Sequence, residues 1–183
     1  MRIIAGKWRG RALIAPDGEA TRPTADRVRE ALFSMLTSRL GDFEDLRVAD
    51  LFAGTGALGL EALSRGAAHV TFVENDPDAV KVLRANIAKL GAEGQTQVIQ
   101  QSVTTLGQAR LPFDLLLLDP PYTSGLAATA LPQLLDRGWI APSSLISVET
   151  GAKEGFTLPG FTVEPVRKHG KAGLHLLRRE DVA

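Results

Sequence analysis

The segment DLFAGTGALGLEAL, residues 50–63, decides the fold class of this chain. It overlaps the end of an apolar stretch, residues 47–53, that is typical of a strand, and it contains a helical pattern over residues 57–65. The loop between them has the pattern G-x-G-x-x-G, formed by Gly54, Gly56 and Gly59. Residues without a Cβ atom allow a tight turn and the close approach of a ligand to the backbone. The segment therefore predicts a strand, a glycine loop and a helix of an α/β fold that binds a nucleoside-containing ligand.

Outside this segment, apolar runs alternate with helical patterns, which is typical of an α/β fold with a parallel sheet. Further strands are expected at residues 69–74, 97–101, 113–119 and 145–149. Helices are expected from Thr24 to about residue 40, at residues 57–65, from Pro77 to residue 90 and at residues 126–136, with Thr24 and Asp76 as N-caps. Residues 161–168 and 173–178 read as a closing antiparallel hairpin, in which Pro165 requires an edge strand or a bulge.

The beginning of the chain has a different pattern. Apolar residues 3–4 and 12–14 flank a stretch rich in glycine and arginine, which predicts a small hairpin or a flexible arm. We therefore expect a basic N-terminal arm over residues 1–20 and one α/β domain over residues 21–183.

Basic side chains gather at both ends of the chain, although 21 Lys and Arg residues balance 21 Asp and Glu residues overall. Such ends can bind a polyanion locally, and the alternative is that they are ordinary solvated charges. The candidates for RNA contact are Lys7, Arg9, Arg11, Arg22 and Arg27. Arg29 suits phosphate binding and a solvated helix face equally well.

Length and composition restrict the class of protein. The chain has 183 residues, of which 44% are hydrophobic and 23% charged, a balance typical of a globular domain. It has no cysteine, so disulfides, thiolate metal sites and thiol nucleophiles are excluded. No apolar run is long enough to cross a bilayer, and the first residues do not resemble a signal peptide. We expect a cytoplasmic protein.

Two acidic residues near the glycine loop indicate which ligand it binds. Glu74 ends the second strand, 20 residues after Gly54, where a carboxylate suits two ribose hydroxyls. Asp50 precedes the loop, and its charge would repel a pyrophosphate but tolerate a ligand with an ammonium and a sulfonium. The pattern therefore favours S-adenosylmethionine over NAD. Glu61, on the following helix, either lines the site or has a structural role.

A second motif, DPPY at Asp119–Tyr122, directly follows the apolar run of the fourth expected strand. Loops at the carboxyl ends of parallel strands share one crevice, so this motif should face the glycine loop. An exocyclic base amine is a poor nucleophile because its lone pair is delocalised into the ring. The Asp119 carboxylate and the Pro120 carbonyl can hold its two N–H groups and aim the lone pair at a methyl carbon, while Tyr122 stacks on the base. The alternative is that the two prolines only end a strand.

These segments together resemble class I methyltransferases, and more closely the RsmD-like family, the 16S rRNA (guanine(966)-N2)-methyltransferases. The resemblance rests on RPTADRVREALF (22–33), DLFAGTGALGLEALSRGA (50–67), FVEND (72–76), DPPY (119–122), DRGW (136–139) and SVE (147–149), in that order. It covers nearly the whole chain.

The resemblance implies a Rossmann-like, seven-stranded, mostly parallel sheet with helices on both faces and a small N-terminal β-hairpin. It also implies methyl transfer from S-adenosylmethionine to guanine N2 of small-subunit rRNA, in the assembled subunit and without a metal. From the two basic ends and the small body of the chain we expect a monomer. The expected catalytic residues are Asp119, Pro120 and Tyr122. The expected donor-binding residues are Thr24, Asp50, Phe52, Gly54, Gly56, Glu74, Asn75, Gln101, Ser102 and Asp119.

One position departs from the broader methyltransferase pattern. Where many relatives carry an acid that contacts the adenine amino group, this chain has Gln101 and Ser102, whose side-chain oxygens can accept the same hydrogen bond. Three other functions stay open: adenine-N6 methylation of DNA or RNA, NAD-dependent oxidoreduction, and non-catalytic RNA binding in ribosome assembly. The first is disfavoured because the chain shows no separate target-recognition domain.

Overall fold

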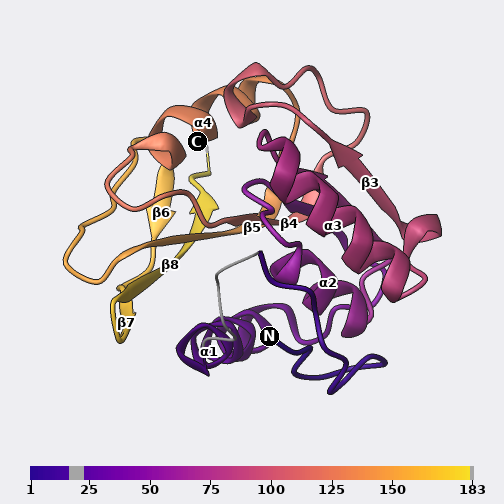
Figure 1. Ribbon diagram of the computed structural model, residues 1–183. Helices are drawn as coiled ribbons and strands as arrows, with labels where there is room; N and C mark the ends of the chain where they lie inside the picture. Colours follow the sequence, from indigo (N-terminus) through magenta and orange to yellow (C-terminus); the bar gives the residue numbers. More distant parts are fainter. Residues whose placement is uncertain (17–22, 182–183) are drawn as a thin grey trace.

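A single mixed β-sheet with helices on both faces forms the protein (Figure 1). The computed structural model describes residues 1–16 and 23–181, with only the backbone of residues 23 and 24. The helices are α1 (Pro23–Leu40), α2 (Ala57–Ser64), α3 (Pro77–Lys89) and α4 (Leu126–Asp136), with short 3₁₀ turns η1 (Glu93–Gln95) and η2 (Val103–Thr105). The strands are β1 (Arg47–Asp50), β2 (His69–Val73), β3 (Thr96–Ile99), β4 (Phe113–Leu118), β5 (Ile140–Gly151), β6 (Phe161–Val163), β7 (Arg167–His169) and β8 (Ala172–Arg179).

The order of the strands reverses next to β1, which is the feature that creates a ligand crevice in such sheets. The sheet runs β3-β2-β1-β4-β5-β8-β6, and β7 pairs with β8 outside this path. Strands β1 to β5 pair in parallel with one another, whereas β8 is antiparallel to β5, β6 and β7. The loops that follow β1 and β4, with the glycine pattern and the DPPY motif, therefore lie side by side at the carboxyl edge.

The central strands are buried on both faces, as their continuous apolar sequences predict. Leu115 and Leu117 of β4 belong to a core cluster with residues of α1, α2 and α3. Leu116 and Leu118 belong to a second cluster with residues of α4 and β8. Because successive side chains of a strand point to opposite faces, one run of leucines anchors the helices on both sides of the sheet.

The last strands differ from the predicted hairpin in number. The backbone from Phe161 to His169 forms two short strands, β6 and β7, which both pair with β8 and are separated by a gap around Pro165. Proline lacks the N–H that a continuous ladder needs. The gap explains why the sheet has eight strands instead of the expected seven.

Strand β5 also differs from its prediction, since it begins at Ile140 rather than at residue 145. Its register with β4 shifts between Phe113 and Leu115. The Ser144 hydroxyl accepts a hydrogen bond from Ala141 N and donates one to Phe113 O, so a side chain bridges the irregular part.

Helix boundaries confirm one predicted N-cap and correct the other. The Asp76 side chain accepts a hydrogen bond from Ala79 N and Pro77 begins α3, as predicted. Helix α1, however, begins at Pro23, so Thr24 lies inside its first turn and is not the cap. The fixed φ of proline suits the first helical position, which moves the start of the helix to Pro23.

The N-terminal hairpin is packed against the domain and is not a flexible arm. Arg2 and Ala12 form an antiparallel bridge, and Ile3 and Leu13 are buried in the same core cluster as α1 to α3. The Glu61 carboxylate of α2 accepts hydrogen bonds from the backbone of residues 4 and 5, which gives this buried acid a structural role. The expected boundary between residues 20 and 21 lies outside the described residues.

The backbone of the hairpin also approaches α2 closely. Gly6 has φ +88°, and a Cβ atom there would come within 1.8 Å of Ser64 O. The neighbouring Lys7 N donates to the same Ser64 carbonyl. This contact requires glycine at position 6. Among the described helices, none is both long and apolar enough to span a membrane.

Candidate active site

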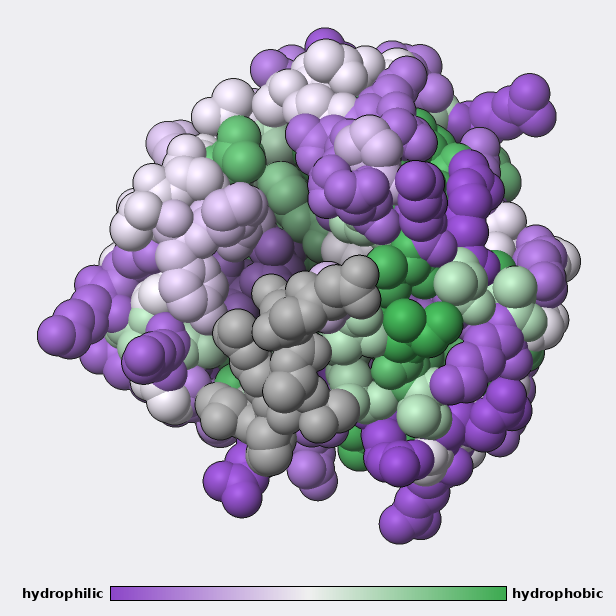
Figure 2. Space-filling model, viewed as in Figure 1, coloured by the Kyte–Doolittle hydropathy of each residue, from purple (hydrophilic) through white to green (hydrophobic). Residues whose placement is uncertain are grey.

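A cavity of about 1130 Å³ opens at the carboxyl ends of β1, β2, β3 and β4. The molecular surface is hollowed at this place, with hydrophilic residues inside the hollow (Figure 2). Loops after these four strands line it, together with residues of α1, the N-terminal hairpin and the turn between β7 and β8. Ligand pockets usually occupy about 300–1,000 Å³. The volume is therefore large enough for more than one small group.

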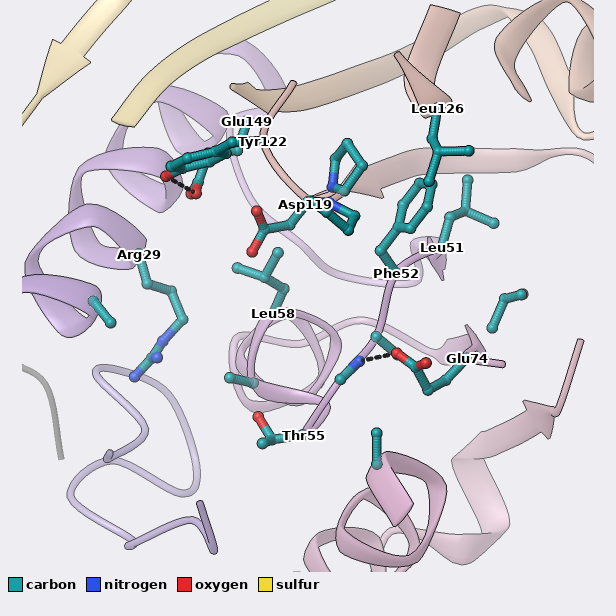
Figure 3. Close-up of a pocket in the computed structure, with 18 of the residues that line it drawn as sticks. Arg29, Leu51, Phe52, Thr55, Leu58, Glu74, Asp119, Tyr122, Leu126 and Glu149 are labelled. Atoms are coloured by element: carbon teal, nitrogen blue, oxygen red, sulfur yellow. Dashed lines mark hydrogen bonds between the residues drawn. The ribbon is translucent and has the colours of Figure 1, made fainter. Parts of the chain in front are cut away.

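The loops after β1, β2 and β3 form one side of this cavity, which we call the donor half. Glu74 lies at its centre and links two of these loops. One Glu74 carboxylate oxygen accepts a hydrogen bond of 2.8 Å from Gly54 N (Figure 3), and the other accepts one of 2.9 Å from Asp76 N. Phe52, Gly54, Glu74 and Asn75, four of the residues that the sequence assigns to donor binding, all line the cavity. Two backbone donors thus fix the carboxylate that the sequence assigned to a ribose.

The three glycines of the loop have different roles. Gly54 lines the cavity, and a Cβ atom there would meet no atom within 4 Å. A Cβ on Gly56, which has φ +87°, would lie 2.5 Å from Leu83 Cδ1, and one on Gly59 would lie 2.4 Å from the Phe72 ring. Gly56 and Gly59 therefore allow α2 to pack closely on α3 and the sheet, and Gly56 is not among the lining residues.

Asp50 lies behind the glycine loop, with its side chain buried, and it does not line the cavity. Its Oδ2 accepts a hydrogen bond of 3.0 Å from Gly59 N, whereas Oδ1 has no partner among the described residues. Burial raises the pKa of the Asp50 carboxyl to about 7; the Gly59 hydrogen bond opposes this rise, and the charge of Glu74 adds to it. A cation near the loop would favour the ionised form.

The loop after β3 contains Gln101 and Ser102, the two residues that the sequence assigns to contact with adenine, and both line the cavity. The Ser102 hydroxyl caps the short helix η2, since it accepts from Thr104 N at 3.3 Å and contacts the Thr104 hydroxyl. Gln101 is exposed, and no hydrogen bond of its side chain is found among the described residues. Gln101 is therefore the freer of the two side chains.

Asp119 dominates the opposite side, the acceptor half, which consists of the DPPY loop and the end of β5. Its side chain points into the cavity across from Glu74 (Figure 3), and Pro120 and Tyr122 line the same cavity. The cavity makes Asp119 accessible, but protein surrounds it on the other sides. This burial raises the pKa of the Asp119 carboxyl to about 8, and the nearby Glu149 and, less strongly, Asp50 raise it further.

Glu149 completes the acceptor half. Leu118 of β4 and Val148 of β5 are the last pair of these parallel strands, so Asp119 and Glu149 are the next residues on each, although β5 continues to Gly151. The Tyr122 hydroxyl donates a hydrogen bond of 2.8 Å to Glu149 Oε2, and burial raises the pKa of Tyr122, with Glu149 adding to the rise. Two carboxylates and a phenol thus meet at one corner of the cavity (Figure 3).

The DPPY loop has a constrained backbone. Thr123 has φ +62°, a left-handed conformation that residues with a Cβ rarely adopt. Glu154 Oε1 accepts hydrogen bonds of 3.1 Å from both Thr123 N and Gly151 N, which ties the loop to the end of β5. The loop therefore presents Asp119 and Tyr122 from a fixed position.

Of the residues predicted to contact RNA, the four that the structure describes, Lys7, Arg9, Arg11 and Arg27, do not line the cavity. Lys7 donates to the Gln95 side chain and Arg11 to Lys89 O, so both lie along the C-terminal end of α3 and the start of β3, at the opposite edge of the sheet. Arg9 and Arg27 are exposed. Arg22 and the side chain of Thr24 lie outside the described residues.

The structure corrects both interpretations of Arg29 that the sequence allowed, because the side chain is neither solvated nor free to bind a phosphate. Its side chain is buried and donates to Arg2 O and, at 3.2 Å, to Asp26. Its Nε lies 3.5 Å from Glu61 Oε1. Arg29 thus joins α1, the N-terminal hairpin and α2 beside the cavity.

Sequence reasoning assigned no role to Glu149, and it noted the β7–β8 turn only as part of the basic end of the chain. Glu149 was quoted only as part of the SVE segment, although an acid at the end of the strand after DPPY is a detectable signal. His169, Gly170 and Lys171 line the cavity from the β7–β8 turn. They reach it because β8 lies beside β5, a pairing between distant segments that sequence periodicity does not reveal.

Comparison with known proteins gives one family. The family described as Conserved hypothetical protein 95 matches residues 1–178. The chain is 40% identical over 182 residues to Ribosomal RNA small subunit methyltransferase D of Escherichia coli K12, covering 98% of this chain and 90% of that protein. It is 44% identical over 154 residues to the protein of the same name from Haemophilus influenzae, covering 82% and 78%.

Solved structures agree with the architecture. The structure of yhhF from Escherichia coli superposes with a TM-score of 0.84 at 39% identity, covering 98% of both chains. The magnesium protoporphyrin IX methyltransferase of Synechocystis, solved with bound S-adenosylmethionine, gives a TM-score of 0.67 at 14% identity and covers 89% of this chain and 87% of its own. The second likeness shows the fold alone, which is the Rossmann-like fold of class I methyltransferases.

Proposed function

Because this chain belongs to the family described as Conserved hypothetical protein 95, the RsmD-like family, we propose that it methylates small-subunit ribosomal RNA with S-adenosylmethionine. The curated relatives named above are rRNA small-subunit methyltransferases. The finer part of the proposal is that the acceptor is guanine N2, at the position that the resemblance implies, 966 of 16S rRNA. We propose the assembled subunit as the substrate, and a monomer in the cytoplasm as the active form.

The observation that carries the proposal is the placement of acids around the point where the two halves of the cavity meet. Asp50 lies behind the glycine loop, and Asp119 and Glu149 lie opposite it. A sulfonium or an ammonium beside these acids would favour their ionised forms, whereas the negative charge of a dinucleotide pyrophosphate would oppose them. This arrangement favours S-adenosylmethionine over NAD at the glycine loop.

The donor half has the groups that the donor requires. Glu74, held by Gly54 N and Asp76 N, retains lone pairs for two ribose hydroxyls. Gln101 is placed to accept a hydrogen bond from an adenine amine, and Phe52 and Asn75 provide further walls. The open space at Gly54 lets the ligand contact the backbone, and the unpartnered Asp50 oxygen fits a cation near the loop.

When bound, S-adenosylmethionine supplies an electrophilic methyl carbon on a positively charged sulfur. The protein's task is then to orient the accepting nitrogen. Asp119 and the Pro120 carbonyl accept the two N–H groups of the amine and turn its lone pair toward the donor half, and Tyr122 lies against the base. Most of the rate enhancement would come from positioning in a site that excludes water.

RNA contact is the least direct part of the proposal. Among the described residues, Lys7, Arg9 and Arg11 on the hairpin, Arg27 on α1 and the basic β7–β8 turn lie around the molecule rather than in one patch. An RNA that contacts all of them would have to cover a broad surface, as a folded ribosomal particle does. This spread favours the assembled subunit over a short single strand.

The proposal is tested by incubating the protein and labelled S-adenosylmethionine with unmodified small subunits, naked ribosomal RNA and duplex DNA, followed by nucleoside analysis. We expect label in N2-methylguanosine, with the largest yield from subunits. Label in N6-methyladenosine would overturn the assignment of the acceptor base. Donor binding without any label would indicate a non-catalytic assembly role.

A further inference from the structure

Glu149 shares the acceptor half of the cavity with Asp119 but has no role in holding the N2 amine. Leu118 and Val148 form the last pair between the parallel strands β4 and β5, each acid directly follows one of them, and both acids line the cavity. Successive side chains of a strand alternate between faces, so Asp119 and Glu149 project to the same face of the sheet. The target base must therefore meet a second carboxylate beside Asp119.

The Glu149 carboxylate is held in a defined orientation. Tyr122 Oη donates to its Oε2 at 2.8 Å, which leaves Oε1 available to a ligand. Within the described part of the chain, no Lys, Arg or His side chain forms an ion pair with Glu149. A protonated Asp119 can donate to Glu149, and this contact is one reason why the pKa of Asp119 is raised. In the ionised pair, both acids can accept hydrogen bonds from the base.

The purine edge that carries the N2 amine explains why two acceptors are useful. In guanine, N1–H and N2–H point in the same direction, so the edge presents two adjacent donors. In adenine and in 2,6-diaminopurine, N1 has no hydrogen and is an acceptor, which a carboxylate would oppose. Leaving such buried polar groups unpaired discriminates strongly between otherwise similar substrates.

We propose that Glu149 accepts the N1–H of the target guanine while Asp119 holds N2–H, so that Glu149 is the residue that selects guanine among purines with an N2 amine. Tyr122 is the positioning residue for this contact, because its hydroxyl fixes the carboxylate. The inference rests on the proposed function and assigns to one side chain the recognition of the base.

The test uses two otherwise identical RNA substrates, assembled into subunits, with guanosine or 2,6-diaminopurine riboside at the methylated position. Both bases carry the N2 amine, and only guanine carries N1–H. For the native protein we expect kcat/KM to be at least about 100-fold higher with guanine. In Glu149→Gln the amide can donate to the bare N1, so we expect the ratio to fall at least about tenfold.

The matched control is Glu154→Gln, the same chemical change at the residue that holds the DPPY loop from behind. Its amide oxygen can still accept from Thr123 N and Gly151 N, so we expect an unchanged ratio. Tyr122→Phe removes only the hydrogen bond to Oε2 and should lower the ratio by a smaller factor, about three- to tenfold. Tyr122→Phe also provides a second test if Glu149→Gln does not fold. Loss of donor binding by Glu149→Gln would reveal such a folding defect.

An unchanged ratio in both Glu149→Gln and Tyr122→Phe, with activity on guanine lowered or not, would overturn the inference and leave the proposed function intact. If the native protein forms no N2-methylated purine on either substrate, the proposed function fails, and this inference fails with it. The two failures are therefore distinguishable in the same experiment.

Discussion

The donor half and the acceptor half of the cavity are built in opposite ways. In the donor half, the Glu74 carboxylate is satisfied by Gly54 N and Asp76 N. In the acceptor half, Asp119 and Glu149 lie next to each other, and no described cation neutralises either of them. A carboxylate whose oxygens accept hydrogen bonds stabilises a preformed binding site. Two adjacent carboxylates repel each other and lower the stability of the fold, so such pairs are retained mainly where they have a catalytic function. The difference supports the proposal that the donor half binds the ligand and that the acceptor half carries out the reaction.

The largest expected effect comes from replacing the central acid of the acceptor half. We expect Asp119→Asn to lower the methyl-transfer rate about 10²–10³-fold, because an amide cannot serve as a purely accepting, charged partner for the amine. The dissociation constant of the donor should change less than about threefold. Rapid-quench transfer assays and calorimetric donor titrations measure the two quantities.

The same variant should be more stable than the native protein. A folded-state pKa of about 8 means that the native state binds more protons than the unfolded chain between about pH 4 and pH 8, so the carboxylate lowers stability as pH rises through this window. We expect Asp119→Asn to raise the free energy of unfolding at pH 8 by about 1–2 kcal/mol, with allowance for water in the cavity, and by less at pH 5. The exposed Asp136→Asn should have no such effect; equal gains in both variants would contradict the account.

A glycine substitution tests whether the glycine loop acts by packing or by ligand contact. Gly56→Ala should lower the free energy of unfolding by about 2–4 kcal/mol, because its φ is positive and the new Cβ would lie 2.5 Å from Leu83 Cδ1. Gly91→Ala also has a positive φ but meets no atom within 4 Å, so it should lower that free energy by only about 1–2 kcal/mol. Chemical denaturation compares them. Weaker donor binding by Gly56→Ala at unchanged stability would instead place Gly56 in the ligand site.

These two halves also differ in how well the sequence predicted them. The glycine loop, Glu74 and DPPY were recognisable because each lies within a few residues of a strand end, and their placement at one sheet edge follows from parallel topology. Asp119 beside Glu149 depends on the register of β4 and β5, and the β7–β8 turn depends on antiparallel pairing with β5. Such long-range pairings leave no local pattern.

Charged residues were the least predictable. Arg29 and Glu61 have ordinary helical positions in the sequence, yet both are buried because the N-terminal hairpin packs over them. The sequence predicts the hairpin but not the surface that it covers. The sequence predicted seven strands and the sheet has eight. Pro165 predicts an interruption of the strand expected at residues 161–168, but it does not show that this strand divides into two.

A smaller expected effect concerns the affinity of the donor half. Glu74→Ala should weaken donor binding about 10–100-fold, because it removes charge-assisted hydrogen bonds to the ribose and frees Gly54 N. Isothermal titration with S-adenosylmethionine measures this. Glu93→Ala, a change of the same kind at an exposed residue, should bind normally, and comparable losses in both variants would remove the special role of Glu74.

The smallest effect is expected in the pH profile of the native protein. Asp119 must be ionised to accept the N–H of the amine and to stabilise the positive charge that develops on its nitrogen. As the pH increases, kcat/KM should therefore rise by about tenfold per pH unit below a midpoint near 8 and then level off. The positive charge of bound donor favours the ionised form, so the midpoint for kcat should lie at lower pH. A profile that is flat from pH 6 to pH 9 would show that Asp119 does not titrate in this range.

The division of the cavity into a binding half and a reacting half is tested most directly by single-turnover methyl transfer measured across a range of donor concentrations in Glu74→Ala and Asp119→Asn. The account predicts that Glu74→Ala approaches the native rate once the donor is saturating, whereas Asp119→Asn stays slow at every concentration. Recovery of Asp119→Asn at high donor concentration, or failure of Glu74→Ala to recover, would contradict it.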